Sequence, residues 1–189
     1  MILLKLLEVN RVGFFAFLWG FAEATVFFII PDVLLTYIAI TQKNKVVVIR
    51  LLLLTLLGAL AGGTVVYMTA QNHPDYVEEI LMRVPSVQTY MLEHVINAMN
   101  SHPFIGLISG PLFGVPYKLF AYAAPHYMTI WMFIICSIPA RLFRFIIVTT
   151  LAYYLSHHIF KQLKHATKII IWLIVWIIVY IIYFGIHGL

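Results

Sequence analysis

Four long apolar stretches constrain this chain more than any other feature of its sequence. They cover residues 12–40, 46–70, 103–155 and 169–186. A helix that crosses a bilayer needs about 20 predominantly apolar residues. Because 63% of the 189 residues are hydrophobic and only 10% are charged, we expect no soluble domain. The chain is interpreted as a single membrane domain over residues 1–189.

The second and last stretches predict plain spanning helices at 46–70 and 169–187. The first and third stretches contain helix breakers, because proline removes a helix hydrogen bond and disfavours helix at the residue before it. We therefore expect a re-entrant helical hairpin at 12–40 and another at 103–125, followed by a spanning helix at 126–155. Their turns are expected at Pro31 in the first hairpin and at Pro111 and Pro116 in the second.

The distribution of Lys and Arg favours two hairpins over two crossings. If both hairpins return to the side from which they enter, the basic residues of 5–11, 43–50 and 161–168 share one side. The positive-inside rule makes that side cytoplasmic. The sequence thus predicts a multi-pass protein of the cytoplasmic (inner) membrane with its N-terminus in the cytoplasm. The first eleven residues are interpreted as a short interfacial helix rather than a signal peptide.

The two hairpins also share a short sequence pattern, Ile-Pro-Asp-Val-Leu-Leu at 30–35 and Val-Pro-Tyr-Lys-Leu-Phe at 115–120. Because the hairpins would enter from opposite sides, this match predicts an inverted pseudo-repeat with a substrate site near the bilayer midplane. Between the halves, segment 74–100 carries apolar residues at helical spacing and predicts amphipathic helices on the outer membrane surface. Gly58 and Gly62 form a small-xxx-small face that predicts close packing against a hairpin.

Five ionisable residues lie inside the apolar stretches: Glu23, Asp32, Lys118, Arg141 and Arg144. Each such residue costs about 2.5–3.5 kcal/mol at mid-bilayer on a translocon scale, which makes a functional role the default hypothesis. A low-dielectric medium favours the neutral form of a carboxylic acid, so Glu23 and Asp32 are candidates for proton coupling. The alternative for Asp32 is a structural role, capping backbone amides at the turn.

Arg141 and Arg144 are three residues apart and share one helical face. A guanidinium stays charged in the membrane and forks onto carboxylate or phosphate. Together with Lys118, these residues are candidates for binding an anionic headgroup. Internal salt bridges to Glu23 and Asp32 are an equally open alternative.

Other chemistry is not indicated. The only cysteine excludes an internal disulfide, and the histidines at 157, 158 and 165 lack metal-ligand spacing. Signatures of hydrolases, metalloproteases and phosphate-binding loops are missing from the sequence. We therefore expect no enzyme activity, no cofactor and no metal site. Nucleic acid is not an expected partner either, because the basic residues flank apolar runs.

Several motifs in order along residues 12–155 resemble the DedA superfamily, also called SNARE-associated or VTT-domain proteins, and most closely its YqaA-like branch. Two departures are Cys136, where many members have arginine, and Thr69-Ala70, where Gly-Arg often follows the tyrosine. The motifs are Phe21-Ala22-Glu23-Ala24-Thr25, Ile30-Pro31-Asp32-Val33-Leu34-Leu35, Gly58-x-x-x-Gly62 with Tyr67, Pro116-Tyr117-Lys118, and Pro139-Ala140-Arg141-Leu142-Phe143-Arg144.

This resemblance implies two opposed re-entrant hairpins and a role in moving or scrambling lipids, with carriers of undecaprenyl phosphate among the members. Glu23 and Asp32 match the acidic positions of the first hairpin, and Arg141 and Arg144 the basic positions after the second. The implied partners are membrane lipids with an anionic headgroup, polyprenyl phosphate among them, and protons.

The leading hypothesis is a transporter or scramblase that moves an anionic phospholipid headgroup across the cytoplasmic membrane, coupled to the proton motive force. A small-ion or proton antiporter would use the same charges without admitting lipid. A structural membrane-assembly factor would use them only as internal bridges.

Overall fold

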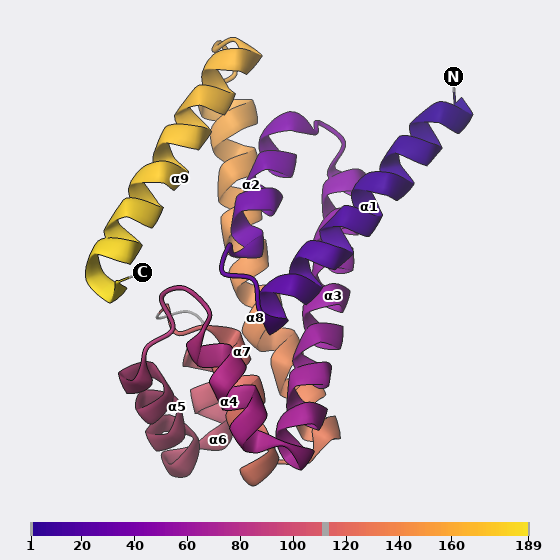
Figure 1. Cartoon of the computed structure of the whole chain (residues 1–189). Helices are drawn as coiled ribbons and strands as arrows, with labels where there is room; N and C mark the ends of the chain where they lie inside the picture. The colour runs from indigo at the N-terminus through magenta and orange to yellow at the C-terminus, as the bar shows by residue number, and fades with distance from the viewer. Residues whose placement is uncertain (1, 111–113, 189) are drawn as a thin grey trace.

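The computed structural model describes residues 2–110 and 114–188, with side chains from residue 11 onward. All regular secondary structure in this part of the chain is helical, with no strand, as predicted (Figure 1). The predicted turn residue Pro111 lies outside the described residues. The helices are α1 (Ile2–Thr25), α2 (Pro31–Thr41), α3 (Lys45–Asn72), α4 (Pro74–Met82), α5 (Thr89–Ser101), α6 (Pro103–Ser109), α7 (Tyr117–Ala123), α8 (Ile130–Tyr154) and α9 (His165–His187).

Among the described residues, three helices are long and apolar enough to cross a membrane, which indicates a membrane protein. They are α3, α9, and α8 with the π-helical turn that continues it to Ile159. Each matches a predicted span with shifted ends. Helix α8 begins four residues later than the predicted 126, because a 3-10 turn occupies Ala124–His126 and the Thr129 hydroxyl accepts a hydrogen bond from the Met132 amide.

The segment of the first predicted hairpin folds as a broken helix pair. Helix α1 ends at Thr25, residues 26–30 are non-helical, and Pro31 starts α2. The two helices form a V in Figure 1 with the break at its apex. Proline suits the first helical turn, where its missing N–H costs nothing. The first eleven residues do not form a short helix of their own, since α1 runs without interruption from Ile2.

Helices α1 and α3 approach so closely that backbone meets backbone. A Cβ placed on Gly58 would overlap the carbonyl oxygen of Phe17, and one placed on Gly62 would lie 2.5 Å from the carbonyl oxygen of Phe21. The predicted small-residue face of α3 therefore packs against the first helix pair. Small residues allow this approach, which maximises van der Waals contact where lipid provides no hydrophobic driving force.

Helices α4 to α7 form a compact group at the end of the molecule away from the N-terminus (Figure 1). The apolar stripes predicted on α4 and α5 exist, but they face the protein. Val77 and Leu81 of α4 and Met91 and Val95 of α5 are buried in one cluster with α7 and the start of α8. Because α7 supplies the apolar partner, the membrane surface expected beneath these stripes is not needed to cover them.

The second predicted hairpin contains two short helices, α6 and α7, on either side of residues 110–116. Pro116 is the N-cap residue of α7, which matches its predicted place at the turn. A helix therefore begins at or after the proline in both copies of the hexapeptide pattern: α2 begins at Pro31 itself, and α7 begins directly after Pro116.

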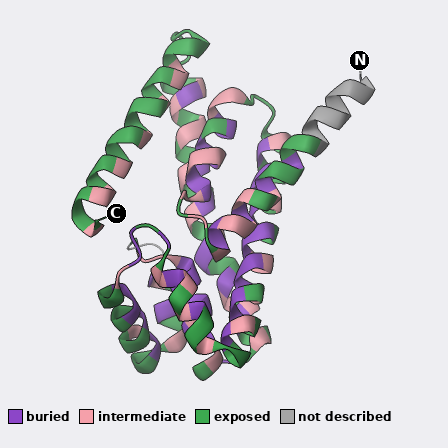
Figure 2. Cartoon of the chain, viewed as in Figure 1, coloured by how far each residue is buried: buried purple, intermediate pink, exposed green. Residues whose placement is uncertain are grey.

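Helix α9 lies along one side of the molecule, and no residue of it is buried (Figure 2). Its C-terminal end is held by the loop before α5, where Ser86 Oγ donates to Gly188 O at 2.8 Å and Gln88 Nε2 donates to His187 O at 2.8 Å. Most of its apolar surface thus remains available to lipid.

We expect Gly58→Val to lower the apparent Tm in detergent by several degrees. Overpacking costs about 1–3 kcal/mol, and each kcal/mol corresponds to about 2–4 °C in a chain of this size. Gly185→Val is the matched control, because a Cβ there meets nothing within 4 Å. A thermal unfolding scan of both variants checks this, and equal Tm values would contradict the close α1–α3 contact.

Candidate functional site

The non-helical break between α1 and α2 is stabilised by one side chain of α1 itself and by two others that come from α7 and α9. Trp19 Nε1 donates to Ile29 O at 3.1 Å, and Lys118 Nζ donates to Phe27 O at 2.6 Å. The amide of Ile30 donates to the Tyr180 hydroxyl at 3.0 Å. Unpaired backbone groups are costly away from water, so these three contacts make a break at this depth of the fold possible.

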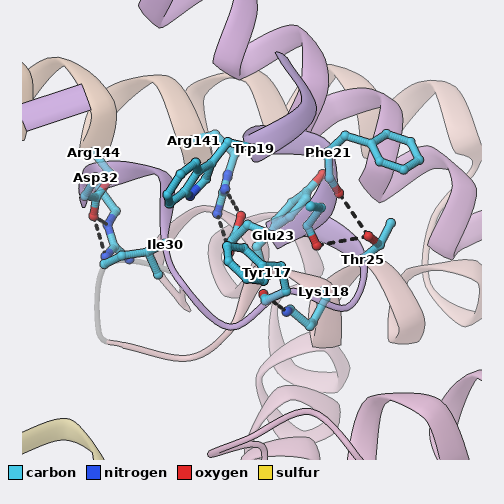
Figure 3. A network of polar contacts seen from close by, with 12 residues as sticks. Trp19, Phe21, Glu23, Thr25, Ile30, Asp32, Tyr117, Lys118, Arg141 and Arg144 are labelled. Carbon is cyan, nitrogen blue, oxygen red and sulfur yellow. Dashed lines mark hydrogen bonds and ion pairs between the residues drawn. The ribbon is translucent and has the colours of Figure 1, made fainter. Parts of the chain in front are cut away.

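One buried ion pair joins α1 to α8 beside this break. The Arg141 guanidinium donates to both carboxylate oxygens of Glu23, and each residue is 3% exposed (Figure 3). The guanidinium also lies 4.8 Å from the centre of the Tyr117 ring and 5.0 Å from that of Phe145. The faces of two aromatic rings and a carboxylate thus stabilise the positive charge of Arg141, which lipid or an apolar core would not stabilise.

A second ion pair joins α2 to α8 one helical turn away. Arg144 Nε and Nη2 lie 2.7 and 2.6 Å from Asp32 Oδ2. Asp32 is 2% exposed, and its Oδ1 has no hydrogen-bond partner among the described residues. The carboxylate therefore binds Arg144, and the alternative role of capping the start of α2 is not the one observed: the N-cap residue is Ile30.

All five ionisable residues predicted from the sequence converge on this region, as Figure 3 shows. Lys118 is 2% exposed and reaches the first break from α7, on the second hairpin. Of the two roles left open for the arginines, the internal salt bridges are present in this conformation.

A cavity of about 170 Å³ opens beside the two ion pairs. Its charged lining comprises Glu23, Lys118, Arg141 and Arg144. The rest of the lining comes from the loops before α2, α5 and α7, from Tyr117, and from Val179, Tyr180 and Tyr183 of α9. Asp32 lies behind Arg144 and is not part of the lining. The volume accommodates several waters or a small polar group. With Asp32 counted, the described charges at the site are three positive and two negative.

Arg141 retains hydrogen-bonding capacity toward a ligand. Its Nε is buried and has no hydrogen-bond partner among the described residues. A guanidinium presents five N–H donors in a fixed fork that fits carboxylate and phosphate equally. Arg141 thus keeps one N–H donor that Glu23 does not use.

Two tyrosines of the site, Tyr117 and Tyr180, were not predicted to belong to it. Tyr117 stacks under Arg141 and donates to Ser137 Oγ at 2.8 Å, and Tyr180 holds the first break from α9. Tyr117 stands between Pro116 and Lys118, so its neighbours were a usable signal. Tyr180 lies in a plain apolar span, where tyrosine usually marks a membrane interface, and gave no such signal.

The described residues contain no group of three His, Cys, Asp or Glu side chains that could hold a metal ion. Comparisons of the chain with protein-family models, curated proteins and solved structures found no match. The resemblance to the DedA superfamily consequently rests on the sequence motifs and stays a prediction.

We expect Glu23→Gln to lower the free energy of unfolding by about 3–5 kcal/mol, because it leaves the Arg141 charge buried and without its counter-ion. The control is Glu79→Gln, which breaks the exposed pair between Glu79 and Arg83, with side chains 63% and 76% exposed. Exposed pairs of this kind contribute about 0.3–0.5 kcal/mol. Denaturant titration in mixed micelles measures both, and equal losses would show that Glu23 and Arg141 are not a buried pair.

Proposed function

We propose that the protein translocates an anionic phospholipid headgroup across the cytoplasmic membrane, with proton exchange at the carboxylates. The observation that carries this proposal is a cavity whose cations outnumber its anions. Lys118, Arg141 and Arg144 are opposed by Glu23 and Asp32, so one positive charge is left over. A phosphodiester carries one negative charge and would complete the balance.

In the proposed mechanism, the lipid phosphate replaces Glu23 at Arg141. The phosphate accepts the two N–H groups that Glu23 now occupies, and Glu23 takes up a proton because a buried, unpaired carboxylate is costly. Tyr117 and Phe145 keep the guanidinium in place during the exchange through their contacts with its faces. Release of the lipid on the other side would reverse both steps, which couples headgroup movement to protons.

The proposed topology follows from the lysines near the connections between helices. We place both helix pairs, α1–α2 and α6–α7, as re-entrant hairpins that meet at the cavity from opposite sides and form an inverted pseudo-repeat. The α2–α3 and α8–α9 connections share one end of the molecule, because Tyr153 donates to Lys43 O at 2.8 Å. These connections and the adjoining starts of α3 and α9 carry Lys43, Lys45, Lys161, Lys164 and Lys168. The positive-inside rule makes that end cytoplasmic.

A structural assembly factor is the second candidate. The observation that favours it is that both arginines are paired with carboxylates in this conformation. Under that function the pairs would only join α8 to α1 and α2, and any arrangement that restored the pairs would restore activity.

We expect Arg141→Ala and Glu23→Ala each to reduce lipid movement at least tenfold, because each removes one partner of the anion exchange. The measurement uses proteoliposomes containing fluorescent phosphatidylglycerol and follows its loss from one leaflet. Glu79→Ala, which removes an exposed acidic residue from α4, serves as the control and should flip lipid at the wild-type rate. Wild-type rates from both site variants would reject the proposal.

The exchanged pair Glu23→Arg with Arg141→Glu separates the two candidate functions. We expect the double variant to recover much of the thermal stability lost in either single variant, because opposite charges again face each other. Lipid movement should stay lost, since the arginine no longer sits between Tyr117 and Phe145 at the cavity. Recovery of activity together with stability would favour the structural role.

A further inference from the structure

Two further cavities lie at the end of the molecule that carries the α2–α3 and α8–α9 connections. One of them, a basic pocket of about 300 Å³, lies between the end of α2, the π-helical turn and the start of α9. Five basic side chains and no acidic one are among the described residues that line it. The basic residues are Lys43, His157, Lys161, His165 and Lys168.

The other cavity is an apolar groove of about 290 Å³ that runs between α2, α8 and α9. Its walls are almost entirely hydrocarbon, with Val148, Leu151 and Val175 among them. The basic pocket and the apolar groove share Ile40, Leu163 and Lys168 in their linings, so they are continuous.

The junction and the floor of the groove are held in place by hydrogen bonds. Lys168 Nζ donates to Ser156 O at 2.6 Å, which fixes the ammonium where the pocket meets the groove. Farther along α9, the indole N–H groups of Trp172 and Trp176 both lie 3.0 Å from Thr36 Oγ1. Their polar edges are therefore satisfied on α2, and their rings present hydrocarbon to the groove.

We propose that this continuous site binds an anionic phospholipid, with its phosphate in the basic pocket and an acyl chain in the apolar groove. The charge of the pocket and the apolar character of the groove both favour this occupant. A cluster of cations that no acidic residue of the described lining opposes needs a negative partner. Basic pockets between membrane helices at the cytoplasmic side suit anionic headgroups. A groove walled by hydrocarbon next to those cations suits the chain of the same molecule.

This lipid site is separate from the cavity of Glu23 and Arg141. The groove ends at Trp176, whereas the cavity beside the ion pairs begins at Val179, about one helical turn farther along α9. Binding at the basic end needs no exchange at Arg141 and no proton. Lipid binding at this site can therefore be tested independently of lipid translocation.

The test is tryptophan quenching in nanodiscs of phosphatidylcholine that contain a small fraction of lipid with brominated acyl chains. Trp131, which is 72% exposed and begins α8 at the opposite end, is first replaced by Phe to remove its signal. We expect brominated phosphatidylglycerol to quench more than brominated phosphatidylcholine at equal content, because its headgroup brings the chain to Trp172 and Trp176.

Two matched charge variants distinguish a built site from general attraction to a basic surface. Lys161→Gln with Lys168→Gln removes two cations that line the basic pocket, and should reduce the preference for phosphatidylglycerol about tenfold. Lys45→Gln with Lys164→Gln removes the same charge at the same end outside the pocket lining, and should leave most of the preference. Equal losses in the two double variants would overturn the proposal.

A second pair of variants tests the groove itself. Ala152→Phe fills the groove, whereas Ala166→Phe adds the same ring on an exposed part of α9 that does not line it. We expect only Ala152→Phe to abolish the quenching by brominated phosphatidylglycerol. Unchanged quenching in Ala152→Phe, or no preference for phosphatidylglycerol in the parent protein, would each reject the lipid site.

Discussion

The buried pair of Glu23 and Arg141 is the interaction on which the rest of the arrangement depends. It joins α1 to α8 across the middle of the protein, with both residues 3% exposed. Neither charge could be kept there alone, since removing one partner of a buried pair leaves an uncompensated charge. The pair fixes α8 beside the first helix break, which in turn positions Arg144 against Asp32 on α2. The cavity exists where these four charges meet.

The break between α1 and α2 depends on the opposite half of the chain. Lys118 comes from α7 and Tyr180 from α9, and each hydrogen bonds to backbone that helix formation leaves unpaired. Lys118 therefore stabilises the helix break through its hydrogen bond to Phe27 O, and it also lines the cavity. Its position explains how one residue can serve the fold and still contribute charge to an anion site.

Helix α9 connects the two candidate sites although none of its residues is buried. One stripe of the helix faces three cavities in succession. Lys168 meets the basic pocket, Trp172 and Trp176 line the apolar groove, and Tyr180 and Tyr183 line the cavity beside the ion pairs. Under the two proposals, an anionic lipid held at the basic end would lie next to the cavity in which a headgroup is exchanged.

The sequence alone determined the helical class, the three long apolar helices and the five charges that matter, because hydropathy and the cost of buried charge are local properties. Only the tertiary structure decided which charges pair: Arg141 could bind Glu23, Asp32 or a ligand until α8 was placed against α1. It also decided that the apolar stripes of α4 and α5 face α7 rather than a membrane surface. Tyr117 and Tyr180 joined the site for the same reason, since contacts between residues far apart in the chain leave no periodic signal along it.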